Sequence, residues 1–497
     1  MERAVPAVIS SAMAILKSQG VSPTERLLAE LCDRTFLRLW SYPNPCRDDG
    51  KELCDLLVVF QNDVLIFFDR ENRRFDQNPE DVDLAWKRWR KEVIDKQVAT
   101  AHGAERYIRS GRSIYLDPQK KQPFPIPIDP SQIRCHKIVV AHGVKEACKR
   151  ASSANVLGSL AISYEEKDER SDRPFFVQID RKHPVHILDT ENLQIALSEL
   201  DTIFDFTAYL DAKLEAIQRH ALSYCGEEDV IAHYFLNFDE KKNRHMIGTL
   251  DAFDMVHIGE GEWFDFERSE LYGRRKEANQ TSYFWDRLLQ ITSNNALKGV
   301  LGGNSKPFHG KSALHFMAME PRFSRRGLSD FMLKSIRNFP ESDEPVVRNV
   351  SLMPSFYEGV VYVFLQLKVS DDLRNSETCR EVRSGMLEIA CAAAKLRMPT
   401  LKRVIGIATD APKFAGKTNS EDLLLMEFED WNAQRRAYYE DANEKLRFFR
   451  TPQMEECKQT ISEFPTATAK SKARGKVGRN ELCVCGSGLK SKKCCGR

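Results

Sequence analysis

The sequence predicts a mixed α/β (α+β) protein built from several units. Three observations favour this class. The chain has 497 residues, more than one ordinary domain needs. Apolar runs of strand length, such as residues 56–60 and 64–68, alternate with stretches that carry apolar residues at helical spacing. The composition, with 42% hydrophobic and 29% charged residues, is that of a globular chain.

The N-terminal third predicts a compact α/β unit over residues 1–185. A Ser-Pro-Thr start at residue 22 precedes a helical pattern that stops before residue 42. Two β-rich runs, 50–60 and 63–70, are joined by Gln-Asn and predict a hairpin. Residues 83–108 predict a helix, and buried strands are expected at 135–143 and 174–180. The order helix, strand pair, helix, strands is typical of one α/β domain.

Asp55 is the polar residue that stands out in this third. It begins a strand that is otherwise apolar on both faces. A buried carboxylate requires a partner, because an isolated buried charge is costly. A divalent metal, a Lys or Arg side chain, or backbone amides would each satisfy it. The next strand ends in Asp69-Arg70.

These residues and this element order resemble the PD-(D/E)xK nuclease superfamily, whose fold is restriction-endonuclease-like. The resemblance implies a Mg²⁺ site that activates water against a phosphodiester. Asp55 matches the first Asp of the family motif, and Arg70 stands at the lysine position. Glu30 is placed where the family has a helix Glu, and Gln97 where it has a helix Gln.

The motif is altered at its second half. Phe68 stands where the second acidic ligand belongs, and Asp69 is one residue out of register, which predicts that it faces the other side of the strand. Glu52 is a candidate for a displaced ligand. Arg70 cannot release its proton as a catalytic lysine does. Two readings stay open: a Mg²⁺-dependent nuclease in defence or repair, or an inactive adaptor in which Asp55 is vestigial or forms a structural salt bridge.

Two clusters of basic residues are further candidates for contacts with nucleic acid. Trp86 and Trp89 alternate with Lys and Arg, which suggests base stacking, but their i, i+3 spacing also fits a packed helix face. A second cluster lies on one predicted helix and favours either a phosphate-contacting patch or a solvated helix start; its members are Arg322, Arg325, Arg326, Lys334 and Arg337.

Residues 186–455 predict a second, larger mixed α/β domain whose function the motifs do not reveal. Residues 192–217 predict a long amphipathic helix, 380–397 an alanine-rich helix, and 401–412 a strand that closes on a turn. Residues 420–449 predict a polar-faced helix. No Walker A stretch or nucleophile elbow appears.

The last residues carry four cysteines with metal-ligand spacing: Cys483-Val-Cys485, eight residues, then Cys494-Cys495. A structural zinc site takes four soft ligands in a tetrahedron, and each cysteine pair can supply two. Glycines in the intervening loop permit tight turns, and its lysines offset the negative charge of four thiolates. So short a segment has no core, so zinc would supply most of its folding free energy.

This segment resembles the SEC-C motif of the bacterial preprotein translocase ATPase, and residues 477–497 form the predicted module. The positions that fit the motif are Gly478, Arg479, Asn480, Cys483, Cys485, Gly486, Ser487, Gly488, Lys490, Lys492, Cys494 and Cys495. The resemblance implies structural zinc and a docking role toward a nucleic-acid or protein partner. It covers about twenty residues and implies no translocase activity.

The charge distribution points to the same end of the chain. Net charge is only +2, yet residues 470–497 hold nine Lys or Arg against Glu481, a local charge of +8. Residues 456–476 predict a flexible basic linker. No signal peptide or membrane span is evident, which predicts a cytoplasmic protein with reduced cysteines.

Overall fold

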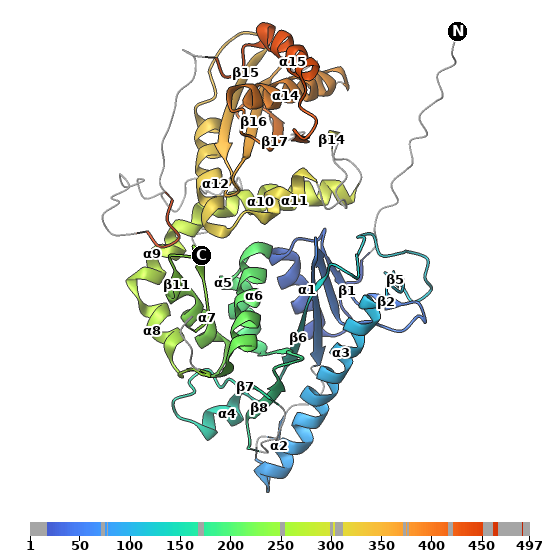
Figure 1. Cartoon of the computed structure of the whole chain (residues 1–497), viewed down its shortest axis with the longest axis vertical. Helices are drawn as coiled ribbons and strands as arrows, with labels where there is room; N and C mark the ends of the chain where they lie inside the picture. Colours follow the sequence, from blue (N-terminus) through green and yellow to red (C-terminus); the bar gives the residue numbers. More distant parts are fainter. Residues whose placement is uncertain are drawn as a thin grey trace. The chain divides into compact units, whose positions relative to one another are not determined.

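The computed structural model describes most of the chain as two compact units (Figure 1). The described residues are 17–70, 75–76, 78–166, 173–248, 254–298, 302–303, 312–370, 374, 377–415, 421–450, 461–465 and 490. The N-terminal unit comprises residues 17–277 together with 464 and 465, and the C-terminal unit comprises residues 278–463. Both contain helices and sheets, so the predicted mixed α/β class is confirmed.

The N-terminal unit is built on a five-stranded sheet. Its strand order is β1 (Ser41–Pro43), β3 (Leu56–Phe60), β4 (Asp63–Arg70), β6 (Arg134–Ala141) and β9 (His186–Asp189). The first three strands form an antiparallel meander. The last two run parallel to β4.

The predicted hairpin at residues 56–70 is confirmed, and its turn has a simple cause. Gln61 adopts the left-handed conformation, with φ +54°, directly after β3. All five residues of β3 are buried, as an apolar central strand requires. The parallel pairing of β4 with β6 needs a long crossover. This crossover is formed by α2 (Val82–Arg90), a π-helical turn η1 (Lys91–Asp95) and α3 (Lys96–Arg109).

Helices cover both faces of this sheet. Phe67 of β4 packs against Phe36, which follows α1 (Pro23–Thr35), with 6.4 Å between ring centroids. Lys137 pairs across strands with Ile66, the neighbour of Phe67, so it faces the opposite side. There its Nζ lies 2.5 Å from Glu105 Oε2 of α3. The sheet therefore lies between α1 and α3, in a three-layer arrangement.

A second sheet in the same unit has the order β13 (Met255–Ile258), β10 (Ala221–Cys225), β7 (Ala161–Glu165) and β8 (Phe176–Asp180). The strand predicted at 174–180 exists as β8, but it belongs to this second sheet. Two short pairs complete the strands: β2 (Cys46–Arg47) with β5 (Ile114–Tyr115), and β11 (Phe238–Asp239) with β12 (Arg244–His245).

The long helix predicted over residues 192–217 is wrong, because the segment forms two helices. These are α5 (Thr190–Glu199) and α6 (Ile203–Arg219). Thr202 begins the second helix, and its Oγ1 accepts a hydrogen bond from Asp205 N–H at 3.0 Å. Because the Thr202 side chain caps the start of α6, the helical pattern of residues 192–217 is divided at this residue. The remaining helices of the unit are α4 (Lys145–Ala151), α7 (Glu227–Leu236), α8 (Glu262–Arg268) and α9 (Glu270–Asn279), which extends into the C-terminal unit.

The C-terminal unit has a five-stranded sheet of its own. Its order is β14 (Gly302–Gly303), β18 (Glu421–Glu427), β17 (Arg403–Asp410), β16 (Val360–Lys368) and β15 (Val347–Pro354). The alanine-rich helix α14 (Glu377–Arg397) connects the parallel strands β16 and β17 and packs on both. A Cβ at Gly406 of β17 would lie 2.8 Å from Cys391 Sγ, so glycine permits this close packing.

The helix predicted over residues 420–449 is wrong in its first part. The apolar run forms β18, and only α15 (Ala433–Leu446) is helical. A short apolar run fits a buried strand as well as a helix, so periodicity alone does not distinguish them. The other helical elements of the unit are η2 (Gln280–Ser282), α10 (Tyr283–Leu297), α11 (Ala313–Met319) and α12 (Arg322–Arg337). Across the described residues, no helix has the length and apolar character to span a membrane.

Candidate functional site

Asp55 lies directly before β3, next to the middle of the main sheet. Its N–H donates to Phe67 O at 3.1 Å, which continues the ladder of the hairpin. Its carboxylate Oδ2 accepts a hydrogen bond from Asp69 N–H at 2.5 Å. A backbone amide is thus the partner of this carboxylate among the three kinds that the sequence left open.

Asn44 connects two further carboxylates to the backbone of Asp55. Asn44 Nδ2 donates to Glu52 Oε1 at 2.6 Å and to Glu25 Oε2 at 3.0 Å, and its N–H donates to Asp55 O at 2.9 Å. We call Glu25, Glu52 and Asp55 the acidic cluster. Its members come from α1 and from the segment that directly precedes β3.

The electrostatics of the acidic cluster favour protonation of Asp55. Burial raises the pKa of Asp55 to about 8, against the lowering effect of the hydrogen bond from Asp69 N–H. The charges of Glu52, Glu25 and Asp69 contribute to this raised pKa. Burial and Glu25 also raise the pKa of Glu52. The acidic cluster therefore favours the binding of positive charge, either a proton or a metal cation.

Glu25 is the functional candidate that the sequence analysis missed. The predicted helix residue, Glu30, is exposed on α1 and takes no part in the acidic cluster. Glu25 forms the start of the helix instead: its N–H donates to Ser22 Oγ at 3.1 Å, and its Oε2 accepts from Val21 N–H at 2.8 Å. The Ser-x-x-Glu pattern of a capping box is a signal that indicates this position.

Among the described contacts of Gln97, none joins it to Asp55, and the side chain of Arg70 lies outside what the structure describes. Gln97 is buried in α3, where its Nε2 donates to Val93 O at 2.8 Å. Arg70 is the last residue of β4. Phe68, in the slot of the second acidic ligand, is buried with 7% of its surface exposed. The pairing of β3 with β4 begins at Leu56 and Phe67, and the backbone contacts of Asp55 with β4 are to Phe67 O and Asp69 N–H.

Asp69 directs its side chain away from the acidic cluster, as its register predicts. Its Oδ1 lies 2.7 Å from His142 Nε2, and His142 Nδ1 lies 2.7 Å from Thr190 Oγ1. Only the backbone N–H of Asp69 reaches Asp55. Within the described ranges, no group of three His, Cys, Asp or Glu side chains is placed to hold a metal ion. The acidic cluster as it stands is therefore not a complete metal site.

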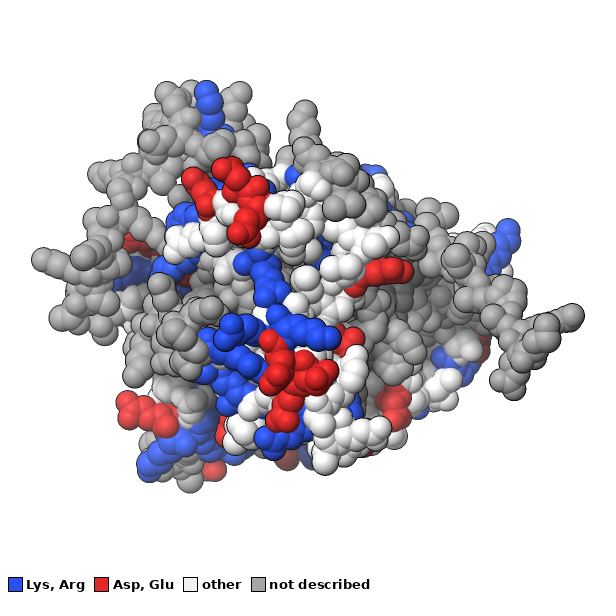
Figure 2. All heavy atoms as spheres, turned by 90° about the horizontal axis from the view of Figure 1, so that it is seen from above, with Lys and Arg blue, Asp and Glu red and all other residues white. Residues whose placement is uncertain are grey.

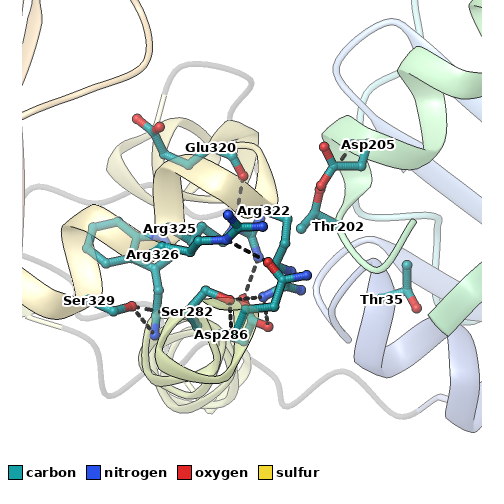
Figure 3. A network of polar contacts seen from close by, with 12 residues as sticks. Thr35, Thr202, Asp205, Ser282, Asp286, Glu320, Arg322, Arg325, Arg326 and Ser329 are labelled. Atoms are coloured by element: carbon teal, nitrogen blue, oxygen red, sulfur yellow. Dashed lines mark hydrogen bonds and ion pairs between the residues drawn. The ribbon is translucent and has the colours of Figure 1, made fainter. Parts of the chain in front are cut away.

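The prediction of a basic surface patch on α12 is wrong for Arg322, Arg325 and Arg326, because these three side chains are buried. Figure 3 shows the network of polar contacts that they form. Arg322 Nη1 lies 2.6 Å from Asp286 Oδ2, and Arg325 Nη1 lies 2.7 Å from Asp286 Oδ1. Arg326 Nε donates to Asn279 Oδ1 at 2.7 Å. These guanidinium groups connect α12 to α10 and α9 and are not available to a phosphate backbone.

Trp86 and Trp89 are also structural. Both are buried, and their rings stack on each other with 5.5 Å between centroids. Trp86 packs in addition on Phe175, at 5.4 Å. The packed-face interpretation of this helix is confirmed, and base stacking on these rings is excluded by their burial.

Comparison with known proteins identifies one segment of the chain. Residues 479–497 match the SEC-C motif. This segment contains Cys483, Cys485, Cys494 and Cys495, and the motif is of a zinc-binding type. The four cysteines lie outside the described residues. Searches of curated proteins and of solved structures find no match to the chain.

We expect one zinc ion per chain, held by these four cysteines. The measurement is elemental analysis after purification without chelator. The double variant Cys494→Ser, Cys495→Ser is expected to lose the metal, because two hard hydroxyls replace two thiolates. Cys148→Ser is the matched control, since Cys148 is a buried lone cysteine of α4. Unchanged zinc in the double variant would place the metal elsewhere.

Proposed function

We propose that this protein binds nucleic acid, and that its N-terminal unit is a nuclease-like core without a complete hydrolytic centre. The connectivity of the unit supports this proposal, because it follows the αβββαβ order of the PD-(D/E)xK nuclease superfamily. The matching elements are α1, the meander β1-β3-β4, a helical crossover and the parallel strand β6. This support is an analogy of fold, so the function depends on the site itself.

One observation carries the non-catalytic half of the proposal: β4, the strand that pairs with β3, has buried Phe68 at the position where the family motif has its second acidic ligand. A phenyl ring offers no oxygen to a hard cation such as Mg²⁺. The nearest alternative, Asp69, is bonded to His142. The carboxylate pair that a hydrolytic metal requires across this hairpin is therefore missing.

The charge of the chain supports the binding half. Residues 470–497 carry nine Lys or Arg against one acidic residue, and they include the SEC-C motif. Such a segment neutralises phosphates and releases counterions, whatever the base sequence. Zinc would hold the end of this segment compact, so that it docks as one module.

We expect the full-length protein to bind labelled DNA and RNA oligonucleotides with an affinity that falls steeply between about 50 and 200 mM salt. Fluorescence anisotropy measures this, and deletion of residues 470–497 is expected to weaken binding and to flatten the salt dependence. In the same samples, Mg²⁺ or Mn²⁺ is expected to produce no cleavage. Binding that is insensitive to salt contradicts the electrostatic basis of the proposal.

The convergence of Glu25, Glu52 and Asp55 favours a second candidate, a metal-dependent nuclease. In that case a cation would gather the three carboxylates, Arg70 would hold a phosphate, and the basic tail would recruit the substrate. Cleavage by the wild-type protein that disappears in Asp55→Asn and persists in Glu30→Gln would establish this candidate. Glu30→Gln is the matched control because Glu30 is exposed on the same helix as Glu25.

A further inference from the structure

A groove of about 740 Å³ lies in the C-terminal unit, between α12, β15 and the segment that follows α15. Among the described residues that line it, the charged ones are all basic: Lys334, Arg348, Arg447 and Arg450. Half-buried Phe331 and Phe449 also line it. Figure 2 shows that Lys and Arg side chains lie beside acidic side chains on one face of the molecule.

The floor of the groove is the edge of a sheet. Its lining includes the consecutive residues 348–352 of β15, whose side chains alternate between the two faces of the strand. A groove that contacts all five therefore runs along the strand edge. β15 is the outermost strand in the order of this sheet, so its edge offers backbone N–H groups as well as side chains. Asn349 and Ser351 add polar groups to this floor.

The four basic side chains of the groove differ in how strongly neighbouring groups hold them. Arg447 and Arg450 are exposed, and the pairing of Arg450 with Glu444 is long, at 3.8 Å. Lys334 retains 45% of its side-chain surface although it contacts Asp330. Arg348 is the more fixed group, because its Nη2 donates to Leu446 O at 2.5 Å and its guanidinium lies 4.9 Å from the Phe448 ring centroid. Arg348 thus holds the segment after α15 in place, and Lys334, Arg447 and Arg450 present their charges to the groove.

The wall after α15 is held in an unusual backbone conformation. Arg447 and Phe449 both have positive φ, at +54° and +52°, which is uncommon for residues other than glycine. Asn443 fastens the segment: its Oδ1 accepts from Phe448 N–H at 2.8 Å, and its O accepts from Arg447 N–H at 2.7 Å. At Arg447 this conformation is the left-handed cap that ends α15, and at Phe449 it is a less common conformation that the surroundings must enforce. Here they place a cation and a ring together in the lining of the groove.

We infer that this groove binds an unpaired strand of nucleic acid, with phosphates on the basic side chains and bases against the phenyl rings. The choice of nucleic acid rests on the proposed function, and the location rests on the groove alone. Positive grooves with aromatic side chains track single strands without base sequence preference. A recess of this volume is within the range of small-ligand pockets and has room for linked nucleotides.

The test uses full-length protein and a labelled oligothymidylate, with anisotropy as the readout. The charge-reversed variant Arg447→Glu, Arg450→Glu is expected to bind at least roughly tenfold more weakly and with a shallower salt slope. Both side chains are exposed, so the fold is retained. The matched control is Lys402→Glu, Arg436→Glu, which makes the same change of charge at exposed positions of the same unit outside the groove. The control is expected to lose much less affinity.

Each other outcome overturns a defined part of the inference. Equal losses in the two variants remove the groove as the binding site and leave the proposed function intact. Wild-type protein that binds no oligonucleotide at low salt refutes the proposed function itself. Equal dependence of duplex binding on Arg447 and Arg450 contradicts the single-strand assignment. Competition by polyglutamate as strong as by unlabelled oligothymidylate shows that the occupant is an acidic peptide on the strand edge.

Discussion

Lys213→Met is expected to destabilise the N-terminal unit by about 3–5 kcal/mol, because it leaves a buried carboxylate without its cation. Lys213 has no exposed surface, and its Nζ lies 2.7 Å and 2.6 Å from the two carboxylate oxygens of Glu227. Tyr209 and Tyr224 donate to the same carboxylate at 2.5 Å and 2.9 Å. The two hydroxyls remain in the variant, but they do not neutralise the charge.

The measurement is chemical denaturation with hydrogen exchange of α6 and α7, while peptides of the C-terminal unit serve as an internal reference. The double variant Lys213→Met, Glu227→Gln is expected to recover much of the loss, since an amide keeps hydrogen bonds without charge. Lys96→Met is the matched control, because Lys96 is half-exposed and its pair with Glu92 lies on a helix surface. It is expected to change stability by less than about 0.5 kcal/mol. A Lys213→Met variant as stable as this control would contradict the buried-pair account.

The elements that the sequence predicted well are those whose signals are local. The hairpin of β3 and β4 follows from two apolar runs and a two-residue turn, and the SEC-C segment follows from cysteine spacing. The hydrophobic pattern alone does not determine where a long helix is divided, or whether a short apolar run forms a helix or a strand. The elements predicted wrongly are of these two kinds. Thr202 divides one amphipathic run into α5 and α6, and the run at residues 421–427 pairs as a strand with β17.

The acidic cluster shows the same limit at the level of single residues. Asp55 and Glu52 can be predicted as site candidates from the sequence, because both directly precede an apolar strand. Glu25 and Glu30 lie five residues apart on one helix, hence on different faces, and only packing decides which faces Asp55. The burial of Arg322 and Arg325 is equally a matter of long-range contact, because Asp286 comes from another helix. A basic stretch in sequence is therefore a weak predictor of a basic surface.

The acidic cluster also makes stability depend on pH, and Asp55→Asn is expected to remove that dependence. The folded pKa of about 8 lies far above the value of about 3.9 in an unfolded chain. The folded state therefore retains a proton that the unfolded state has released, and stability falls as pH rises from about 4 to 8. Asparagine keeps an oxygen that accepts from Asp69 N–H but carries no charge.

The size of the effect has an upper limit. A tenfold change in proton affinity corresponds to about 1.4 kcal/mol, so the full difference in pKa corresponds to about 6 kcal/mol. Asp55 is partly exposed, and solvent screening reduces this limit. We expect Asp55→Asn to be more stable than the wild type by about 2–3 kcal/mol near pH 9 and nearly equal to it near pH 4. Denaturation midpoints across this range measure the difference, with Glu30→Gln as the exposed control.

The same variant separates the two candidate functions. If the carboxylate of Asp55 forms a structural ion pair, Asp55→Asn is less stable at every pH above about 4, because the partner loses its counter-charge. If the acidic cluster holds a divalent cation, Mg²⁺ or Mn²⁺ stabilises the wild type near neutral pH and leaves Asp55→Asn unchanged, since a ligand stabilises only the form that binds it. A stabilising Asp55→Asn together with a wild type that does not respond to either cation is the result expected of a core that binds nucleic acid without hydrolysing it.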